Sequence, residues 1–378
     1  MPDASHGEEK KMLKQKLIFI IAIAISMFLV YGCNGKNDSQ NNNYEGKIIL
    51  DEQGSFAFGG IVTKAAGEYN GYELFSSSNG QTHHSDHGYA FYQIPINARK
   101  YPIVFLHGGG QSARSFETTP DGREGFQNIF LKKGFSVYLV DQPRRGRAGR
   151  GSVSITINPT PDESSLFNWF RLGFYPDANE GVQFKMDEET LNQYYRQVTP
   201  NTGAFDEEVI SDAMSELFNK IGEGILVAHS QGGGPAFFTA IKNNKVKSLV
   251  LYEPGGCTFP FPAGEMPSSN DITMPAYLPI QEISVEDFNK LAQIPIVLYF
   301  GDFIPNEHSE NPFAEEWRLR IGLMKIWENT LRKHGGDVEI VMLPEVGIYG
   351  NTHFPFSDLN NVEVADLLYK YLEDKKLN

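Results

Sequence analysis

One short run in the second half of the chain reads Gly224-Ile-Leu-Val-Ala-His-Ser230-Gln-Gly-Gly-Gly-Pro235. Its apolar first half predicts a buried strand, and the glycines after Ser230 predict the start of a helix. A serine in such a turn projects its hydroxyl from a strained backbone, and nearby positions must be small because strand and helix crowd there. Ala228 and Gly232 meet that condition. The run therefore predicts a nucleophilic serine at Ser230.

Short apolar runs elsewhere in the chain extend the same alternation of strand and helix. They are nearly continuous in Val, Ile and Leu, which is typical of strands buried on both faces of a parallel sheet. The predicted strands are 103–106, 136–140, 225–228, 249–252, 296–300 and 338–343, and the helical patterns between and after them include 235–243, 315–334 and 361–373. This alternation predicts an α/β fold with a mostly parallel central sheet and helices on both faces.

One segment interrupts the alternation. Residues 151–203 are rich in Pro, Asn and aromatic side chains, including Phe167-Asn-Trp-Phe170. So many aromatic residues outside a regular pattern favour a lined cavity over a plain surface loop. We therefore expect a cap insertion that covers one end of the sheet.

A nucleophilic serine needs a base to accept its proton and a carboxylate to orient that base. His353 follows the last predicted strand, where the base is expected in this chain order. Two carboxylates compete for the third role, because Glu253 ends the strand at 249–252 and Asp302 ends the next strand. Position alone favours Asp302, since the acid of such folds often follows that later strand.

Backbone donors for a developing oxyanion are predicted in two places. The first is the N–H of Gln231, at the start of the helix that follows Ser230. The second is the loop His107-Gly-Gly-Gly-Gln111, where the glycines let the backbone turn inward. Either Gly109 or Gly110 can supply the second donor.

From Gly59 to the C-terminus the chain resembles the esterase-713-like branch of the bacterial α/β-hydrolases. The motifs that carry the resemblance are Tyr101-Pro-Ile-Val-Phe-Leu-His107-Gly, Glu117-Thr-Thr-Pro-Asp121-Gly-Arg123, Asp141-Gln-Pro-Arg-Arg-Gly-Arg147, His229-Ser-Gln-Gly, Tyr252-Glu-Pro-Gly and Gly350-Asn-Thr-His353. The resemblance implies an α/β-hydrolase fold, Glu253 rather than Asp302 as the acid, and oxyanion donors at Gly109 and Gln231. One departure is that Gly109-Gly110 stands where some members have a vicinal cysteine pair.

The first 32 residues are typical of an export signal. Four lysines precede an apolar run at 17–30, whose 14 residues are too few for a comfortable membrane span. Gly32-Cys33 follows the apolar run, as in a bacterial lipobox. We therefore expect Cys33 to be the lipidated first residue of the mature chain. The alternative is a signal-anchor helix that is followed by an incidental cysteine. The polar residues 33–45 predict a flexible tether, and 46–378 the hydrolase domain.

The amino-acid composition limits which kinds of molecule the protein is expected to bind. The 378 residues include 33 basic and 47 acidic side chains, a net charge of −14, and two cysteines. The acidic excess argues against nucleic acid, because a phosphate-binding surface normally appears as a basic excess. We expect a small-molecule ester substrate, no cofactor, no metal, and membrane contact only through the lipid anchor. The oligomeric state is left open, with a dimer among the options.

Two rival functions remain open. Thr82-His-His-Ser-Asp-His87 is similar to the H-x-H-x-D-H zinc signature, although Thr82 replaces the first ligand. A catalytic zinc site needs three or more protein ligands and an open position. A metal-dependent hydrolase using His83, His84, Asp86 and His87 is therefore one rival, and a non-catalytic binding protein of the same fold is the other. The basic run 144–150 is expected to brace neighbouring loops.

Overall fold

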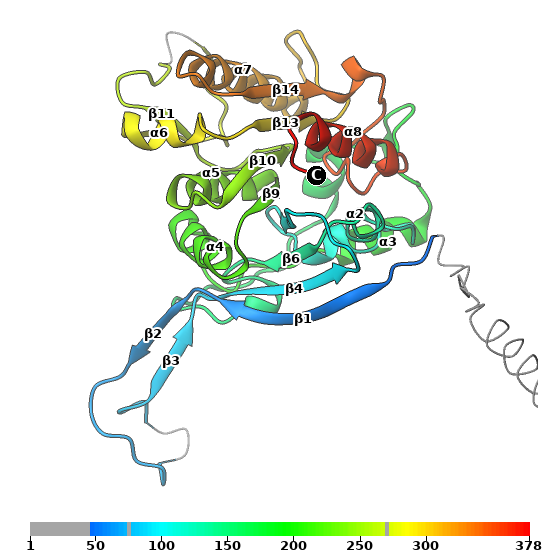
Figure 1. Ribbon diagram of the computed structural model, residues 1–378. Coiled ribbons are helices and arrows are strands. Elements are labelled where there is room, and N and C mark those ends of the chain that lie inside the picture. The colour runs from blue at the N-terminus through cyan, green and yellow to red at the C-terminus, as the bar shows by residue number, and fades with distance from the viewer. Residues whose placement is uncertain (1–45, 74–76, 269–271) are drawn as a thin grey trace, which may run out of the picture. The chain divides into compact units, whose positions relative to one another are not determined.

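The computed structural model describes residues 46–73, 77–268 and 272–378, and an eight-stranded sheet lies at its centre (Figure 1). The strands are β1 (Leu50–Phe58), β4 (Gly88–Pro95), β5 (Ile103–Leu106), β6 (Val137–Asp141), β9 (Gly224–His229), β10 (Val246–Tyr252), β13 (Ile296–Phe300) and β14 (Val338–Met342). Their order is β1-β4-β6-β5-β9-β10-β13-β14. β4 pairs antiparallel with both β1 and β6, and all later neighbours are parallel. The expected mostly parallel sheet is confirmed.

Consecutive residues of the central strands pack on opposite faces of the sheet. In β5, Ile103 and Phe105 belong to one hydrophobic cluster, whereas Val104 and Leu106 belong to the other. Helices α4 (Glu207–Ile221), α5 (Gly233–Lys242), α6 (Val285–Leu291) and α7 (Pro312–Lys333) supply side chains to the cluster of Val104, and α2 (Phe126–Lys132), α3 (Glu188–Arg196) and α8 (Asn361–Asp374) to that of Ile103. Burial on both faces is the reason that these strands are continuous apolar runs.

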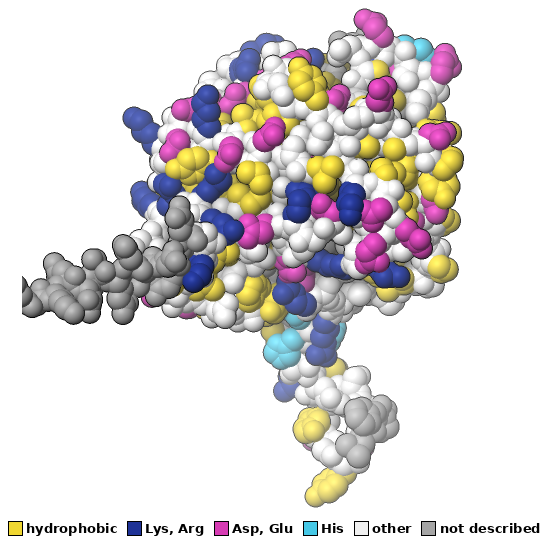
Figure 2. Space-filling model, turned by 90° about the vertical axis from the view of Figure 1, so that its right-hand side faces the viewer, with side chains coloured by type: hydrophobic (Ala, Val, Ile, Leu, Met, Phe, Trp, Pro, Cys, Tyr) yellow, Lys and Arg dark blue, Asp and Glu magenta, His cyan; other side chains and the backbone are white. Residues whose placement is uncertain are grey.

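Between β1 and β4 the chain leaves the sheet. β2 (Ile61–Lys64) and β3 (Thr82–Ser85) pair antiparallel and form a separate two-stranded ribbon. The ribbon projects from the body of the molecule in both Figure 1 and Figure 2. On the face drawn in Figure 2, acidic and basic side chains are interspersed over the body.

The segment 151–203 contains little regular structure, as its sequence predicts. It holds a π-helix at Glu163–Trp169, the short strands β7 (Gly173–Phe174) and β8 (Asp177–Ala178), and α3. Asp187 begins α3 by accepting a hydrogen bond from the Thr190 N–H at 2.9 Å. The π-helix brings Trp169 and Phe170 to the carboxyl end of the sheet, where they line a cavity.

Residues 48–378 form one compact unit. The predicted signal (1–32), the tether (33–45) and Cys33 lie outside the described residues. Within the described part of the chain, no helix combines the length and the apolar character needed to cross a bilayer.

Candidate active site

Ser230 lies at the sharp turn between β9 and α5. Its φ of 50° falls in the left-handed region, which a serine rarely adopts without surrounding constraint. Two glycines make room for the turn. A Cβ on Gly108 would lie 2.8 Å from the Ser230 Cβ, and one on Gly232 would lie 2.7 Å from the His107 carbonyl oxygen. The strained backbone thus holds the Ser230 hydroxyl at the carboxyl end of the sheet.

His353 lies in the loop between β14 and α8 and faces Ser230. Its Nε2 is 2.9 Å from the Ser230 Oγ, and its ring is buried. The backbone N–H of His353 donates to the Phe170 carbonyl oxygen at 3.0 Å, while the Phe170 ring stacks on the imidazole with centroids 4.5 Å apart. These contacts hold the imidazole in an orientation in which its Nε2 faces the Ser230 hydroxyl.

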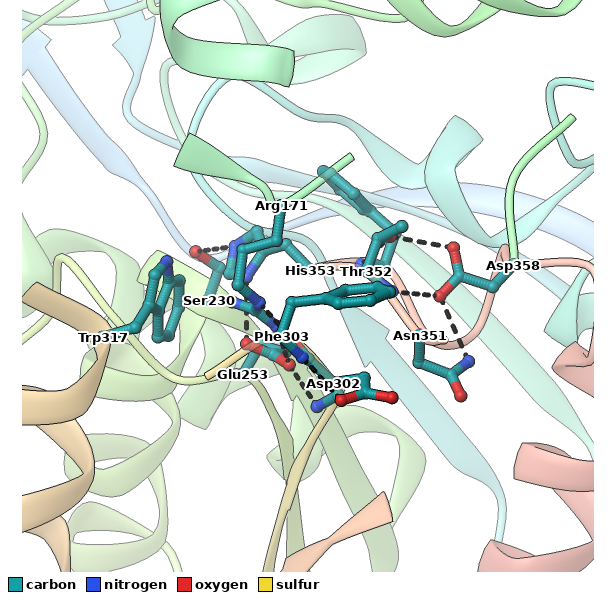
Figure 3. A network of polar contacts seen from close by, with 12 residues as sticks. Arg171, Ser230, Glu253, Asp302, Phe303, Trp317, Asn351, Thr352, His353 and Asp358 are labelled. Carbon is teal, nitrogen blue, oxygen red and sulfur yellow. Dashed lines mark hydrogen bonds and ion pairs between the residues drawn. The ribbon is translucent and has the colours of Figure 1, made fainter. Parts of the chain in front are cut away.

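Glu253 follows β10 and completes a row of three side chains (Figure 3). Its Oε2 lies 3.3 Å from the Nδ1 of His353, and the carboxylate is fully buried. The other oxygen, Oε1, accepts from the Arg171 Nη2 at 2.6 Å and from the Gly301 N–H at 2.5 Å. These two donors fix Glu253 so that only Oε2 is directed at the imidazole.

Asp302, the carboxylate that position alone favours, points elsewhere. Its Oδ2 accepts from the Gly350 N–H at 2.8 Å and its Oδ1 from the Phe303 N–H at 2.7 Å. Among the described contacts its carboxylate has none with His353. Asp302 shapes the loop that carries the histidine, and Glu253 occupies the place beside the imidazole.

The charges around His353 favour its neutral form. Burial, together with the nearby Arg171 and Arg320 guanidinium groups, holds the pKa of His353 well below its usual 6.5. A neutral imidazole can hydrogen-bond a carboxylate through Nδ1–H and accept a proton at Nε2. The arrangement is thus able to remove a proton from the Ser230 hydroxyl.

The expected oxyanion donors lie beside the serine. Gly109 and Gln231 line one cavity of about 470 Å³ together with Ser230, whereas Gly110 is not among its lining residues. A Cβ on Gly109 would lie 3.2 Å from the Gln231 Oε1, so the two segments meet closely at this point. Gly110 instead bonds its carbonyl oxygen to the Thr199 N–H. The geometry therefore brings Gly109 and Gln231, rather than Gly110, to the nucleophile.

The zinc-like cluster is not assembled as a ligand set. Asp86 is buried and forms an ion pair with Arg144, whose Nε and Nη2 donate to its two oxygens at 2.8 and 3.0 Å. Ser152 also donates to this carboxylate. Among the described residues, no group of three His, Cys, Asp or Glu side chains is placed to hold a metal ion. His83, His84 and His87 thus lie on or next to the β2–β3 ribbon with their acidic neighbour already engaged.

The basic run after β6 braces loops, as predicted. Besides the Arg144 ion pair, the Arg145 Nη1 donates to the carbonyl oxygens of Gly108 and Gln111 at 3.1 and 3.0 Å. Arg147 pairs with Asp141 at 2.7 Å. These contacts hold the loop that carries Gly109.

Several residues of this network were assigned no role from the sequence. Arg171 comes from the segment 151–203 and, like Ser230 and Glu253, has a positive φ. His229 bonds the His353 carbonyl oxygen through Nε2 at 2.9 Å. Asp358 accepts from the Thr352 N–H, the Thr352 hydroxyl and the Asn351 side chain, and thereby fixes the loop before His353 (Figure 3). A buried arginine in an irregular segment is the kind of signal that only the fold reveals.

Comparison with known proteins agrees with this geometry. The model of the family described as "Alpha/beta hydrolase family" matches residues 103–336. A probable secreted lipase, phiG, of Fungal sp. (strain ATCC 74256) is 28% identical over 313 residues, which is 74% of this chain and 84% of the lipase. A solved structure described as a novel bacterial esterase has 28% identity and a TM-score of 0.66, over 86% of this chain and 96% of that chain. The family match spans more than half of the residues, and the chain belongs to the alpha/beta hydrolase family.

Proposed function

We propose that this protein is an exported serine esterase, anchored by a lipid on Cys33, that hydrolyses carboxylic esters through an acyl-enzyme. The observation that carries the proposal is the 2.9 Å contact between the Ser230 Oγ and the His353 Nε2, with Ser230 lining an apolar cavity. The names of the two relatives, an esterase and a lipase, support the same reaction class.

In the first half of the reaction, Ser230 attacks the ester carbonyl while His353 takes its proton at Nε2. The carbonyl oxygen becomes an oxyanion, which the N–H groups of Gly109 and Gln231 stabilise. Glu253 holds the imidazole in the required tautomer and stabilises its positive charge. The bond to the leaving alcohol then breaks, and His353 returns the proton to that oxygen.

In the second half, water attacks the acyl group on Ser230. His353 accepts a proton from the water and then gives it to the Ser230 oxygen as the acid departs. Every proton transfer uses Nε2, so no cofactor or metal ion is needed for the cycle. The Phe170 ring on one side of the imidazole limits the approach of bulk water to His353.

Labelling with a fluorophosphonate tests the nucleophile. The probe should modify Ser230, and mass mapping of the peptide should identify it. Ser230→Ala should lose both labelling and ester hydrolysis while keeping its circular dichroism spectrum. Ser164→Ala is the matched control, because Ser164 lines the same cavity and should be dispensable. Labelling at a different serine, or hydrolysis by Ser230→Ala at a near-normal rate, would contradict the assignment of Ser230 as the nucleophile.

Lipid anchoring is tested in the producing cell. The 14-residue apolar run followed by Gly32-Cys33 supports cleavage before Cys33, and the secreted lipase relative supports export. Wild-type protein should incorporate labelled fatty acid and fractionate with membranes, and Cys33→Ser should do neither. Cys257→Ser serves as the control, because the Cys257 thiol is buried in the fold. Unchanged processing of Cys33→Ser would contradict the anchor.

A further inference from the structure

The cavity beside Ser230 has aromatic walls and one charged group. Trp169 and Phe170 come from the end of the π-helix, Tyr277 from the loop before β12 (Ile280–Ile283), and Phe313 from the first turn of α7. Arg320, from the middle of α7, also lines the cavity. Its guanidinium, which forms an ion pair with Glu316, therefore lies among aromatic rings in the cavity that Ser230 also lines.

Arg320 is 2% exposed, and the protein supplies hydrogen-bond acceptors for only part of its guanidinium group. Its Nε donates to the Glu316 Oε1 at 3.1 Å. Glu316 is itself occupied, because its two oxygens accept from the backbone N–H groups of Ala276 and Tyr277. For the Nη1 and Nη2 groups of Arg320, no acceptor is found among the described residues. Because Arg320 lines the cavity, these groups are accessible to a bound molecule that supplies acceptor oxygens, and hydrogen bonds from a guanidinium to charged oxygens are strong.

The guanidinium is held in place by two indole rings. Its central carbon lies 4.9 Å from the ring centroid of Trp169 and 4.7 Å from that of Trp317. The indole N–H of Trp317 donates to the Trp169 carbonyl oxygen at 3.0 Å, which joins the two rings. Arg320 is therefore pre-organised, and binding a ligand requires little further loss of side-chain freedom.

Arg320 is also close to the reacting atoms. A Cβ on Gly255 would lie 2.7 Å from its Nη1, and the carbonyl oxygen of the same glycine is 3.4 Å from the Ser230 Oγ. Gly255 therefore lies between the Arg320 guanidinium and the Ser230 hydroxyl. A substrate whose ester group is at Ser230 would place a nearby substituent within reach of Arg320.

We propose that Arg320 binds a carboxylate carried by the substrate, so that the preferred substrates are esters with a free carboxylate, such as half-esters of dicarboxylic acids. The inference rests on the proposed serine-esterase function and adds the substrate class. A guanidinium matches a carboxylate with two parallel hydrogen bonds, and such charge-assisted pairs are stronger than neutral ones. The aromatic walls would contact the carbon skeleton between the ester and the carboxylate.

Matched ester pairs test this preference. Monomethyl terephthalate is compared with methyl 4-carbamoylbenzoate, and 4-acetoxybenzoate with 4-acetoxybenzamide. Within each pair the skeleton is constant and a carboxylate is exchanged for a neutral amide of similar size; the two pairs place it on the acyl and the alcohol side. In at least one pair, wild type should favour the acid by about 10- to 100-fold in kcat/KM, as the loss of a charged hydrogen-bonded pair implies.

The variants Arg320→Met and Arg320→Lys separate recognition from folding. Arg320→Met should reduce the preference for the acid to near unity, with the amide ester changed only a few-fold. Arg320→Lys keeps the charge without the two-pronged geometry and should fall between. Arg318→Met is the control, because Arg318 lies on the same helix, pairs with Glu315 at 2.5 Å and does not line the cavity.

A measurement on wild type covers the case in which the variants fail to fold. Benzoate should inhibit hydrolysis of the neutral ester 4-nitrophenyl acetate more strongly than benzamide does, in a competitive manner. Equal or weaker use of the acid in both pairs, with equal inhibition by benzoate and benzamide, would overturn the role of Arg320. Hydrolysis of 4-nitrophenyl acetate through Ser230 would still stand in that case, so the two proposals fail separately.

Discussion

At the scale of single residues, the two oxygens of Glu253 have different partners. Arg171 and Gly301 both donate to Oε1, which leaves Oε2 to face the His353 Nδ1. In Glu253→Gln the carbonyl oxygen would stay with those two donors, and the amide NH2 would face Nδ1. The imidazole would then carry its proton on Nε2, toward Ser230, where it cannot accept one. We expect kcat to fall by about 10⁴, the loss in kcat seen when a triad acid becomes an amide.

Asp302→Asn is the matched comparison for that prediction. The Asp302 carboxylate bonds two backbone N–H groups and does not contact the imidazole among the described residues. Its amide would keep one of these bonds, at a cost of about 1 kcal/mol in the free energy of unfolding. Steady-state kinetics on one activated ester, with circular dichroism as the folding check, should show Asp302→Asn nearly unchanged. A crippled Asp302→Asn beside an active Glu253→Gln would reverse the assignment of the acid.

These residues also show how far sequence reasoning reaches. Ser230 could be predicted because the constraint is local: a strand, a serine and glycines that avoid backbone clashes. For the acid, position alone favours Asp302 and only the family resemblance indicates Glu253, since the two residues end neighbouring strands at the same edge of the sheet. Which of them faces His353 depends on donors from Arg171 and Gly301, which lie far apart in the chain.

At the scale of elements, residues 169–171 connect the segment 151–203 to the candidate active site. Phe170 stacks on the His353 ring and accepts from its backbone N–H. Arg171 pairs with Glu253 and donates through Nε to the Asp302 carbonyl oxygen at 2.9 Å. Three consecutive residues at the end of the π-helix therefore hold the base, the acid and the aromatic wall of the cavity. The segment predicted as a cap therefore supplies side chains that shape the candidate active site.

Arg171 is predicted to act as a positioning residue whose charge lowers the pKa of His353. Burial is the largest cause of the low pKa of His353 and remains in Arg171→Gln, but loss of the Arg171 charge favours the protonated imidazole, so the pKa should rise while staying below its usual value. The acid limb of the kcat/KM profile should move upward in pH, and kcat should fall because Glu253 loses its partner. Arg171→Lys keeps the positive charge and should return the acid limb to its wild-type pH. The control is Arg318→Gln, since Arg318 pairs with Glu315 and is not among the charges that shift the pKa of His353; an unmoved limb in Arg171→Gln would assign Arg171 a purely structural role.

The strands and helices to which the sequence analysis gave ranges agree with the structure to within a few residues. Burial on both faces makes 103–106 and 296–300 continuous apolar runs, and β5 and β13 have these same limits. The π-helix was not predictable, because its position depends on the Trp169–Trp317 and Phe170–His353 contacts rather than on a local pattern. Periodicity reports what a segment buries, but not which partner from another part of the chain it will meet.

At the scale of the whole molecule, buried titratable side chains link stability to pH. His107, His229 and His353 are buried, and burial is the largest cause that lowers the pKa of each, for His107 to about 4. Asp358 has the opposite shift, because burial raises its pKa to about 7. The three imidazoles stay neutral in the folded protein at a pH where the unfolded chain would protonate them. Asp358 does the reverse, since its buried carboxyl group keeps a proton that the unfolded chain would lose at the same pH.

The sign of the pH dependence follows from these proton counts. Between pH 6 and 5 the unfolded chain binds about three protons more at the histidines and one fewer at the aspartate, a net excess of about two. Stability therefore rises with pH in this window and falls on acidification, by about 2 to 3 kcal/mol per unit. Urea unfolding at a series of pH values measures the slope. His107→Gln should reduce it by about one proton. If the three imidazoles were instead protonated in the folded state, only the Asp358 difference would remain and stability would fall as pH rises from 5 to 6; that result would contradict the neutral form of His353 on which its role as a base depends.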